Sequence, residues 1–137
     1  MKIETAYMID VSGGIYLEWL ESISTLLLQK QQDRSDSVVA YFTTKIEAVA
    51  VMPWWNPELL YVARSGRGGT DFISALREIR DTYSPSKVVV WSDGYFSFPA
   101  PQEIRGLELE WFLSEPSCVR DINHYGYLGK AYQWKVD

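Results

Sequence analysis

Three short polar clusters in this 137-residue sequence carry the side-chain types that bind hard metal ions. They are "DVSGG" with Asp10 and Ser12, "GGTD" with Thr70, and "WSDG" with Asp93. Mg²⁺ prefers oxygen ligands and commonly takes one or two carboxylates while keeping several waters. Each cluster alone is typical of a helix cap or a turn. The clusters therefore point to a metal only if the fold brings them together.

The spacing of apolar residues predicts the elements that would position these clusters. Residues 45–52 alternate and are predicted to pair with residues 37–44 as an antiparallel edge strand. The other predicted strands cover residues 3–9, 86–92 and 107–113, with a terminal strand or hairpin over residues 127–136, and the two long helices cover residues 14–32 and 70–83. Residues 59–63 form a further short segment of undetermined type.

This alternation of strands and helices indicates the fold class. It predicts an α/β, three-layer, Rossmann-like sandwich with a mostly parallel sheet and one antiparallel edge strand, in a single domain over residues 1–137. In such sheets ligands bind at the carboxyl ends of the strands, where the strand order reverses. Asp10 and Asp93 both end predicted strands, and Thr70 begins a helix from the same side. We therefore expect the three clusters to converge.

Composition and charge narrow the classes of function. The formal charge of −5 argues against general nucleic-acid binding, which needs clustered Lys and Arg. No apolar run approaches the roughly 20 residues of a membrane span, and no signal sequence is recognisable, so we expect a cytoplasmic protein. His124 is the only histidine and Cys118 the only cysteine, which excludes a His-Glu-x-x-His site and a Cys-rich zinc site.

The ordered set of clusters resembles the von Willebrand factor A (VWA) fold and its metal-ion-dependent adhesion site. "DVSGG" is similar to the family's Asp-x-Ser-x-Ser motif, Thr70 to its loop threonine, and Asp93 to the aspartate of its third motif, over residues 3–114. "GRGGTDF", "VVVWSDGYFSFP" and "WFL" look most like the VWA-like domain at the C-terminus of bacterial metallopeptidase-like proteins. The resemblance implies a site for Mg²⁺, or Mn²⁺ or Ca²⁺, formed by these residues. It also implies a protein partner such as an AAA-type ATPase or a metallopeptidase-like protein.

Two positions bear on that resemblance. Gly14 stands where the first motif has its second serine, so one hydroxyl ligand is missing. A water replaces it, the affinity falls, or the site is vestigial. Asp71 follows Thr70 directly, and it is either a hydrogen-bond acceptor behind the metal ligands or an acidic residue favoured at a helix N-terminus.

Aromatic and basic residues outside these clusters are candidates for partner contacts. Trp54 and Trp55 lie between prolines and either form a partner-binding patch or cover the core beneath a loop. Arg67, with Arg64, either steers an acidic partner toward the predicted rim or is an ordinary solvated arginine.

Three functions agree with these observations. The first is a non-enzymatic module in which the bound cation is completed by a partner carboxylate. The second is a metal-dependent hydrolase, a phosphoesterase or nuclease, in which Asp10 and Asp93 hold Mg²⁺. The third is a metal-free scaffold of the same fold, for which Gly14 is the main argument.

Overall fold

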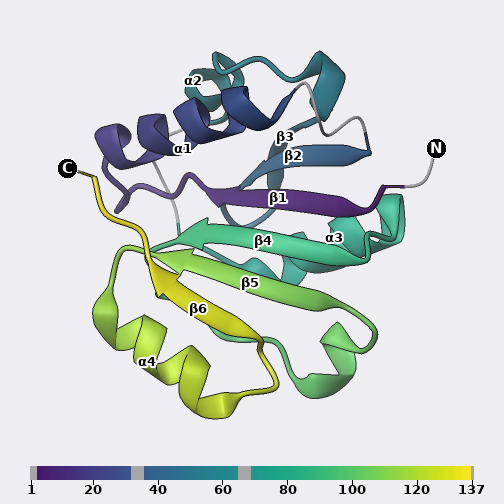
Figure 1. Cartoon of the computed structure of the whole chain (residues 1–137), viewed down its shortest axis with the longest axis vertical. Coiled ribbons are helices and arrows are strands. Elements are labelled where there is room, and N and C mark those ends of the chain that lie inside the picture. Colours follow the sequence, from purple (N-terminus) through teal and green to yellow (C-terminus); the bar gives the residue numbers. More distant parts are fainter. Residues whose placement is uncertain (1–2, 32–35, 65–68, 137) are drawn as a thin grey trace.

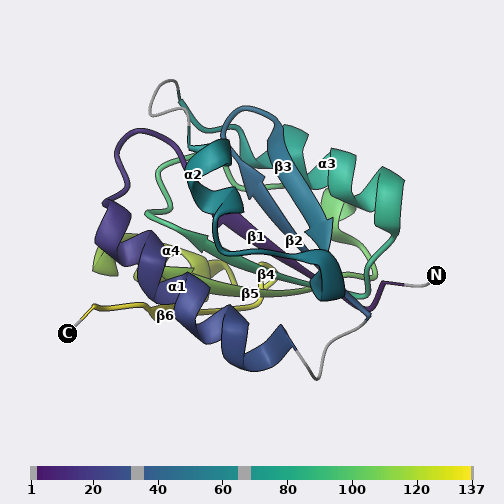
Figure 2. The same cartoon turned by 90° about the horizontal axis from the view of Figure 1, so that it is seen from above.

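A six-stranded mixed sheet runs through the described chain, with helices on both of its faces (Figures 1 and 2). The computed structural model describes residues 3–31, 36–64 and 69–136. The strand order is β3-β2-β1-β4-β5-β6, in which only β2 and β3 pair antiparallel. The strands are β1 (Thr5–Asp10), β2 (Ser37–Phe42), β3 (Ile46–Val51), β4 (Lys87–Ser92), β5 (Glu108–Leu113) and β6 (Lys130–Gln133).

Four α-helices cover the two faces of this sheet. They are α1 (Leu17–Lys30), α2 (Leu59–Ala63), α3 (Phe72–Tyr83) and α4 (Pro116–Tyr125), with short 3-10 helices η2 (Met52–Trp54) and η3 (Pro101–Ile104). One apolar cluster joins α1 and α2 to one face, and a second joins α3 and α4 to the other. Figure 2 shows α1 and α3 on opposite sides of the sheet. The predicted α/β sandwich with one antiparallel edge strand is confirmed.

The central strands explain why the sequence signal was strong here. All six residues of β1 and of β2 are buried, and β4 is buried from its second residue onward. Parallel strands covered on both faces read as continuous apolar runs, because both sets of alternating side chains enter a core. Asp10 and Ser92, which end β1 and β4, are therefore polar residues buried in otherwise largely apolar strands.

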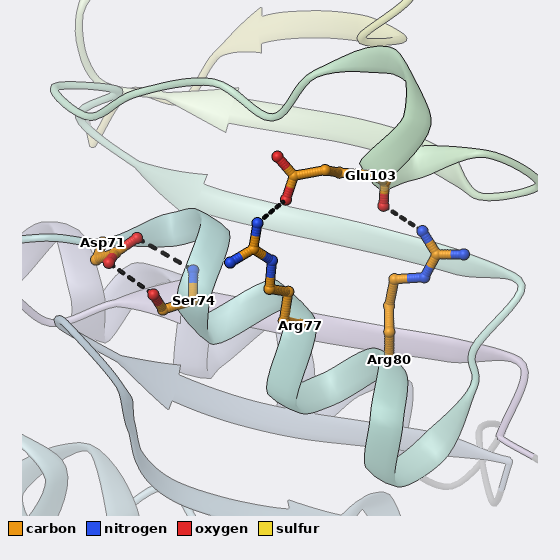
Figure 3. Close-up of polar contacts among 5 residues, drawn as sticks. All are labelled: Asp71, Ser74, Arg77, Arg80 and Glu103. Atoms are coloured by element: carbon orange, nitrogen blue, oxygen red, sulfur yellow. Dashed lines mark hydrogen bonds and ion pairs between the residues drawn. The ribbon is translucent and has the colours of Figure 1, made fainter.

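Helix α3 is fixed at its start and along its exposed side by polar contacts (Figure 3). Asp71 accepts hydrogen bonds from the backbone N–H of Ser74 at 3.1 Å and from its hydroxyl at 2.7 Å, which makes Asp71 the N-cap. Arg77 forms an ion pair with the Glu103 carboxylate at 3.0 Å, and Arg80 donates to the Glu103 carbonyl oxygen. These contacts connect α3 to η3, in the crossover between β4 and β5.

The C-terminal third differs from the sequence prediction. Helix α4 was not predicted, and it connects β5 to β6 so that β6 pairs parallel to β5. The terminal segment is therefore a strand and not a hairpin. The connection between β4 and β5, residues 93–107, returns the chain to a parallel neighbour, as the predicted mostly parallel sheet requires. None of the helices in the described ranges has the length and apolar character that crossing a membrane requires.

Candidate metal site at the carboxyl edge of the sheet

The strand order places Asp10 and Asp93 at the point where the topology reverses. β1 and β4 are neighbours at the centre of the sheet, and the chain leaves β1 toward β2 but leaves β4 toward β5. Asp10 is the last residue of β1, and Asp93 follows the last residue of β4. Open α/β sheets bind ligands in the crevice at such a reversal. The predicted convergence of these two residues is thus a property of the topology.

Asp10 is a buried carboxylate held on both oxygens. It is 0% exposed, and Ser12 beside it is 5% exposed. Its Oδ1 accepts from the backbone N–H of Ser12 at 2.9 Å, and its Oδ2 accepts from the Ser92 hydroxyl at 2.6 Å. Ser92 Oγ in turn accepts from the backbone N–H of Gly94 at 3.0 Å. The carboxylate is therefore oriented by one hydrogen bond within its own loop and one from the neighbouring strand.

The surroundings of Asp10 disfavour its charged form. Burial raises the pKa of its carboxyl, the hydrogen bonds from Ser92 and Ser12 oppose this rise, and the charge of Asp93 adds to it. No lysine or arginine within the described ranges forms an ion pair with either aspartate. An ionised Asp10 thus lacks a protein countercharge among these residues.

Asp93 and Gly14 lie next to each other at the same edge. Asp93 Oδ1 accepts from the backbone N–H of Tyr95 at 3.0 Å, which closes the turn after β4. A Cβ atom placed on Gly14 would lie 3.8 Å from Asp93 Oδ2, an ordinary contact distance. A serine at this position would therefore carry its hydroxyl close to the Asp93 carboxylate.

The third cluster, "GGTD", is held at this edge by a backbone hydrogen bond to the residue that follows β2. The backbone N–H of Asp71 donates to the carbonyl oxygen of Thr43 at 2.9 Å, and Thr43 follows Phe42, the register partner of Asp10. Thr70 is half-buried, and within the described ranges no hydrogen bond joins it to either aspartate. Hydrogen bonds from Ser74 lower the pKa of Asp71. The Asp71 carboxylate thus faces the first turn of α3, as expected for a helix N-terminal acid.

A cavity of about 310 Å³ opens beside Asp93. Gly14, Tyr16, Tyr95 and Glu115 are among the residues that line it. The charge of Glu115 raises the pKa of the exposed Tyr95 hydroxyl, and Asp93 contributes to the same rise. The space next to Asp93 is therefore accessible and negatively charged.

The two tryptophans of the "PWWNP" loop have opposite environments. Trp55 is 3% exposed, and its indole N–H donates to the Tyr41 hydroxyl at 2.9 Å. Of the two alternatives for Trp55, the structure thus agrees with the one in which the ring covers the core, and not with partner contact. Trp54 is 81% exposed, and its role in partner binding stays a prediction.

Arg64 and Arg67 are the two arginines predicted near the rim. Arg67 lies outside the described residues. Arg64 donates from Nη2 to the carbonyl oxygen of Ile15 at 2.7 Å, in the loop that follows β1. Arg64 therefore supports the first loop, next to Gly14.

Sequence reasoning missed Ser92. The residue was treated only as part of a turn, yet its hydroxyl links Asp10 to the Gly94 N–H. The available signal was a serine at the last position of a strand predicted to neighbour β1. Within the described ranges, no three His, Cys, Asp or Glu side chains gather where they would hold a metal.

The candidate donors at this edge are all oxygen atoms, the ligand type that hard cations prefer. The carboxylates of Asp10 and Asp93 and the Ser12 hydroxyl come from the two loops at the reversal, and Thr70 lies at the end of the loop that leads into α3. Comparison of the sequence with protein-family models and with curated proteins finds no match.

Proposed function

We propose that this chain is a non-enzymatic protein-binding module that works with a divalent cation at the carboxyl edge of the sheet. Asp10, Ser12, Thr70 and Asp93 would hold the ion, with Mg²⁺ as the first choice and Mn²⁺ or Ca²⁺ as alternatives. The resemblance to the VWA fold supports this assignment, and so does the strand order, with its single antiparallel edge strand.

One observation carries the proposal: Asp10 is fully buried beside a second aspartate at the reversal of strand order, and no described lysine or arginine pairs with it. A buried charge without a countercharge is costly, and a buried carboxylate is normally paired or coordinates a metal. The hydrogen bonds from Ser92 and Ser12 fix the direction of the carboxylate. That arrangement is expected of a ligand oriented by its surroundings.

The remaining donors suggest how a partner would take part. Ser12 and Thr70 offer uncharged hydroxyls, so the cation would keep its attraction for a further carboxylate from outside the chain. The cavity beside Asp93 leaves room for that side chain. Exposed Trp54 would add apolar contact at a distance from the ion. An AAA-type ATPase or a metallopeptidase-like protein is the partner class that the resemblance implies.

The proposal is tested by capture of partners on immobilised protein. Wild type, Asp93→Asn and the exposed control Asp81→Asn are each incubated with native cell extract, in Mg²⁺ or in a chelator. We expect the same proteins on wild type and Asp81→Asn in Mg²⁺, and their loss in chelator or with Asp93→Asn. Capture that is indifferent to both chelator and Asp93→Asn would contradict metal-dependent binding.

Gly14 favours a second candidate, a metal-free scaffold, because the serine hydroxyl expected beside Asp93 is absent. In that case the loops would bind the partner directly. The chelator arm of the same experiment separates the two candidates, since only the metal-free scaffold keeps its partners there.

A further inference from the structure

A second cavity, of about 330 Å³, lies between α1 and the sheet. Its lining includes Thr5 and Lys87, the first residues of β1 and β4, whereas Asp10 and Asp93 lie at the other ends of these strands. The cavity is therefore separate from the candidate metal site. Its volume falls at the lower end of the range for small-molecule pockets. Figure 1 shows that α1 runs along β1 and leaves β5 and β6 without a helix on this side.

Aromatic rings form much of the wall. The ring of Trp91 stacks on that of Phe112 with centroids 5.3 Å apart and lies 5.9 Å from that of Tyr7, and all three residues line the cavity. Leu26 and Val89 add aliphatic surface. Flat rings prefer offset stacking or edge contacts with other rings. The wall thus suits a planar, aromatic ligand.

Trp91 also carries a hydrogen-bond donor, its indole N–H, that has no partner among the described residues. Its side chain is 1% exposed, and its indole N–H is buried with no hydrogen-bond acceptor among the described residues. Burial of a donor without an acceptor is unfavourable, and such a group in a folded protein calls for an explanation. The indole N–H of Trp91 is therefore a buried reporter for a ligand that packs on this wall.

One lysine of the cavity is left without an anionic partner among the described residues. Lys30, Lys87 and Glu110 are the charged residues that line the cavity. Lys87 is already close to Glu110, at 3.9 Å, and to Glu108, at 3.4 Å. Lys30, in the last turn of α1, pairs with no carboxylate in the described ranges. The ammonium group of Lys30 is therefore the one left to pair with a ligand, and it suits a monoanion.

We propose that this cavity binds a small aromatic carboxylate of one or two rings. The rings lie against Trp91, Phe112 and Tyr7, and the carboxylate pairs with Lys30. The proposal is independent of the metal site, because the two sites share no lining residue.

The test is an NMR titration of the full chain with 2-naphthoate, 2-naphthalenemethanol and 2-naphthylmethylammonium. The indole N–H signal of Trp91 is assigned by its loss in Trp91→Phe. We expect a saturable shift of this signal with 2-naphthoate, and binding that is weaker for the alcohol and weakest for the ammonium compound. Lys30→Met is expected to weaken 2-naphthoate binding about tenfold, since it removes a charge-assisted contact, and to leave alcohol binding unchanged.

Lys45→Met, an exposed lysine outside the cavity, is the matched control and should bind 2-naphthoate as wild type does. The proposal is overturned if the Trp91 signal does not move at millimolar 2-naphthoate. It is equally overturned if the ammonium compound binds as well as the carboxylate, or if Lys30→Met has no more effect than Lys45→Met.

Discussion

The Ser92 hydroxyl donates a 2.6 Å hydrogen bond to Asp10 Oδ2, joining two residues that are 82 positions apart in the chain. The contact bridges the ends of β1 and β4, at the reversal of strand order. Ser92 therefore ties the two loops of the candidate site together. It also sets which Asp10 lone pairs remain for another ligand.

Replacement of Ser92 by Ala is expected to cost about 1–3 kcal/mol in the free energy of unfolding. The substitution leaves Asp10 Oδ2 without its donor and the Gly94 N–H without its acceptor, and both groups are buried. Chemical denaturation measures the loss. Ser97→Ala, at an exposed position in the loop after β4, should change stability by less than about 0.5 kcal/mol. Equal effects of the two substitutions would contradict a structural role for the Ser92 contact.

A serine at position 14 is expected to strengthen cation binding. The added Cβ atom would lie 3.8 Å from Asp93 Oδ2 without a clash. Gly14→Ser therefore adds the hydroxyl ligand that the candidate site lacks beside Asp93. One added ligand should raise the affinity for Mn²⁺ about tenfold, or ~1.4 kcal/mol. Gly14→Ala supplies the same Cβ without the hydroxyl and should leave the affinity near that of wild type. If the two variants bind Mn²⁺ equally, Gly14 does not occupy a ligand position.

Gly94→Ala should destabilise the fold strongly. Gly94 has φ +89°, and a Cβ atom there would lie 2.7 Å from Cys118 Cβ on α4. Backbone strain and overpacking together should cost about 3 kcal/mol or more. Gly106→Ala is the matched control, because Gly106 has φ +76° but nothing within 4 Å of an added Cβ. Thermal unfolding should show a clearly larger loss for Gly94→Ala, and equal losses would rule out the close approach of α4.

Alkaline pH is expected to weaken the fold through Tyr41. Burial raises the pKa of its hydroxyl from 10.0 to about 12, against the opposing hydrogen bond from Trp55. The folded state therefore favours neutral Tyr41. This stability is full below pH 10 and is lost as pH rises through about 12. The loss amounts to about 3 kcal/mol, for a difference of about two pH units.

Tyr41→Phe tests this assignment. The variant should be less stable than wild type at neutral pH, because the Trp55 indole N–H loses its acceptor. The gap should narrow between pH 10 and 12 when unfolding free energies are measured across this range. A constant gap would show that Tyr41 does not titrate in that window.

The fold was predictable because its central strands are buried on both faces. The apolar runs of β1, β2 and β4 and the four-residue spacing in α1 leave few alternatives. Helix α4 was missed because it is only 10 residues long and buries only Cys118 and Ile122, so few apolar residues mark it in the sequence. Its start at Pro116 was the remaining cue, since proline favours the first turn of a helix.

The site was predictable in its topology but less so in its contacts. Because β1 and β4 are neighbours at the reversal of strand order, the backbone alone places Asp10 and Asp93 close together. The choice between Trp54 and Trp55 depends on a single 3-10 turn, η2, which turns one ring outward and the next inward. Sequence spacing does not encode that choice, because the two residues are adjacent and identical.

The most direct measurement of the central claim is a titration of the chain with Mn²⁺, in which free ion is followed by electron paramagnetic resonance. Wild type and Asp81→Asn, which alters charge on the exposed side of α3, should both bind one ion, and Asp93→Asn should bind none or bind far more weakly. Wild type that binds no ion, or Asp93→Asn that binds it as wild type does, would contradict a metal site formed by Asp10 and Asp93.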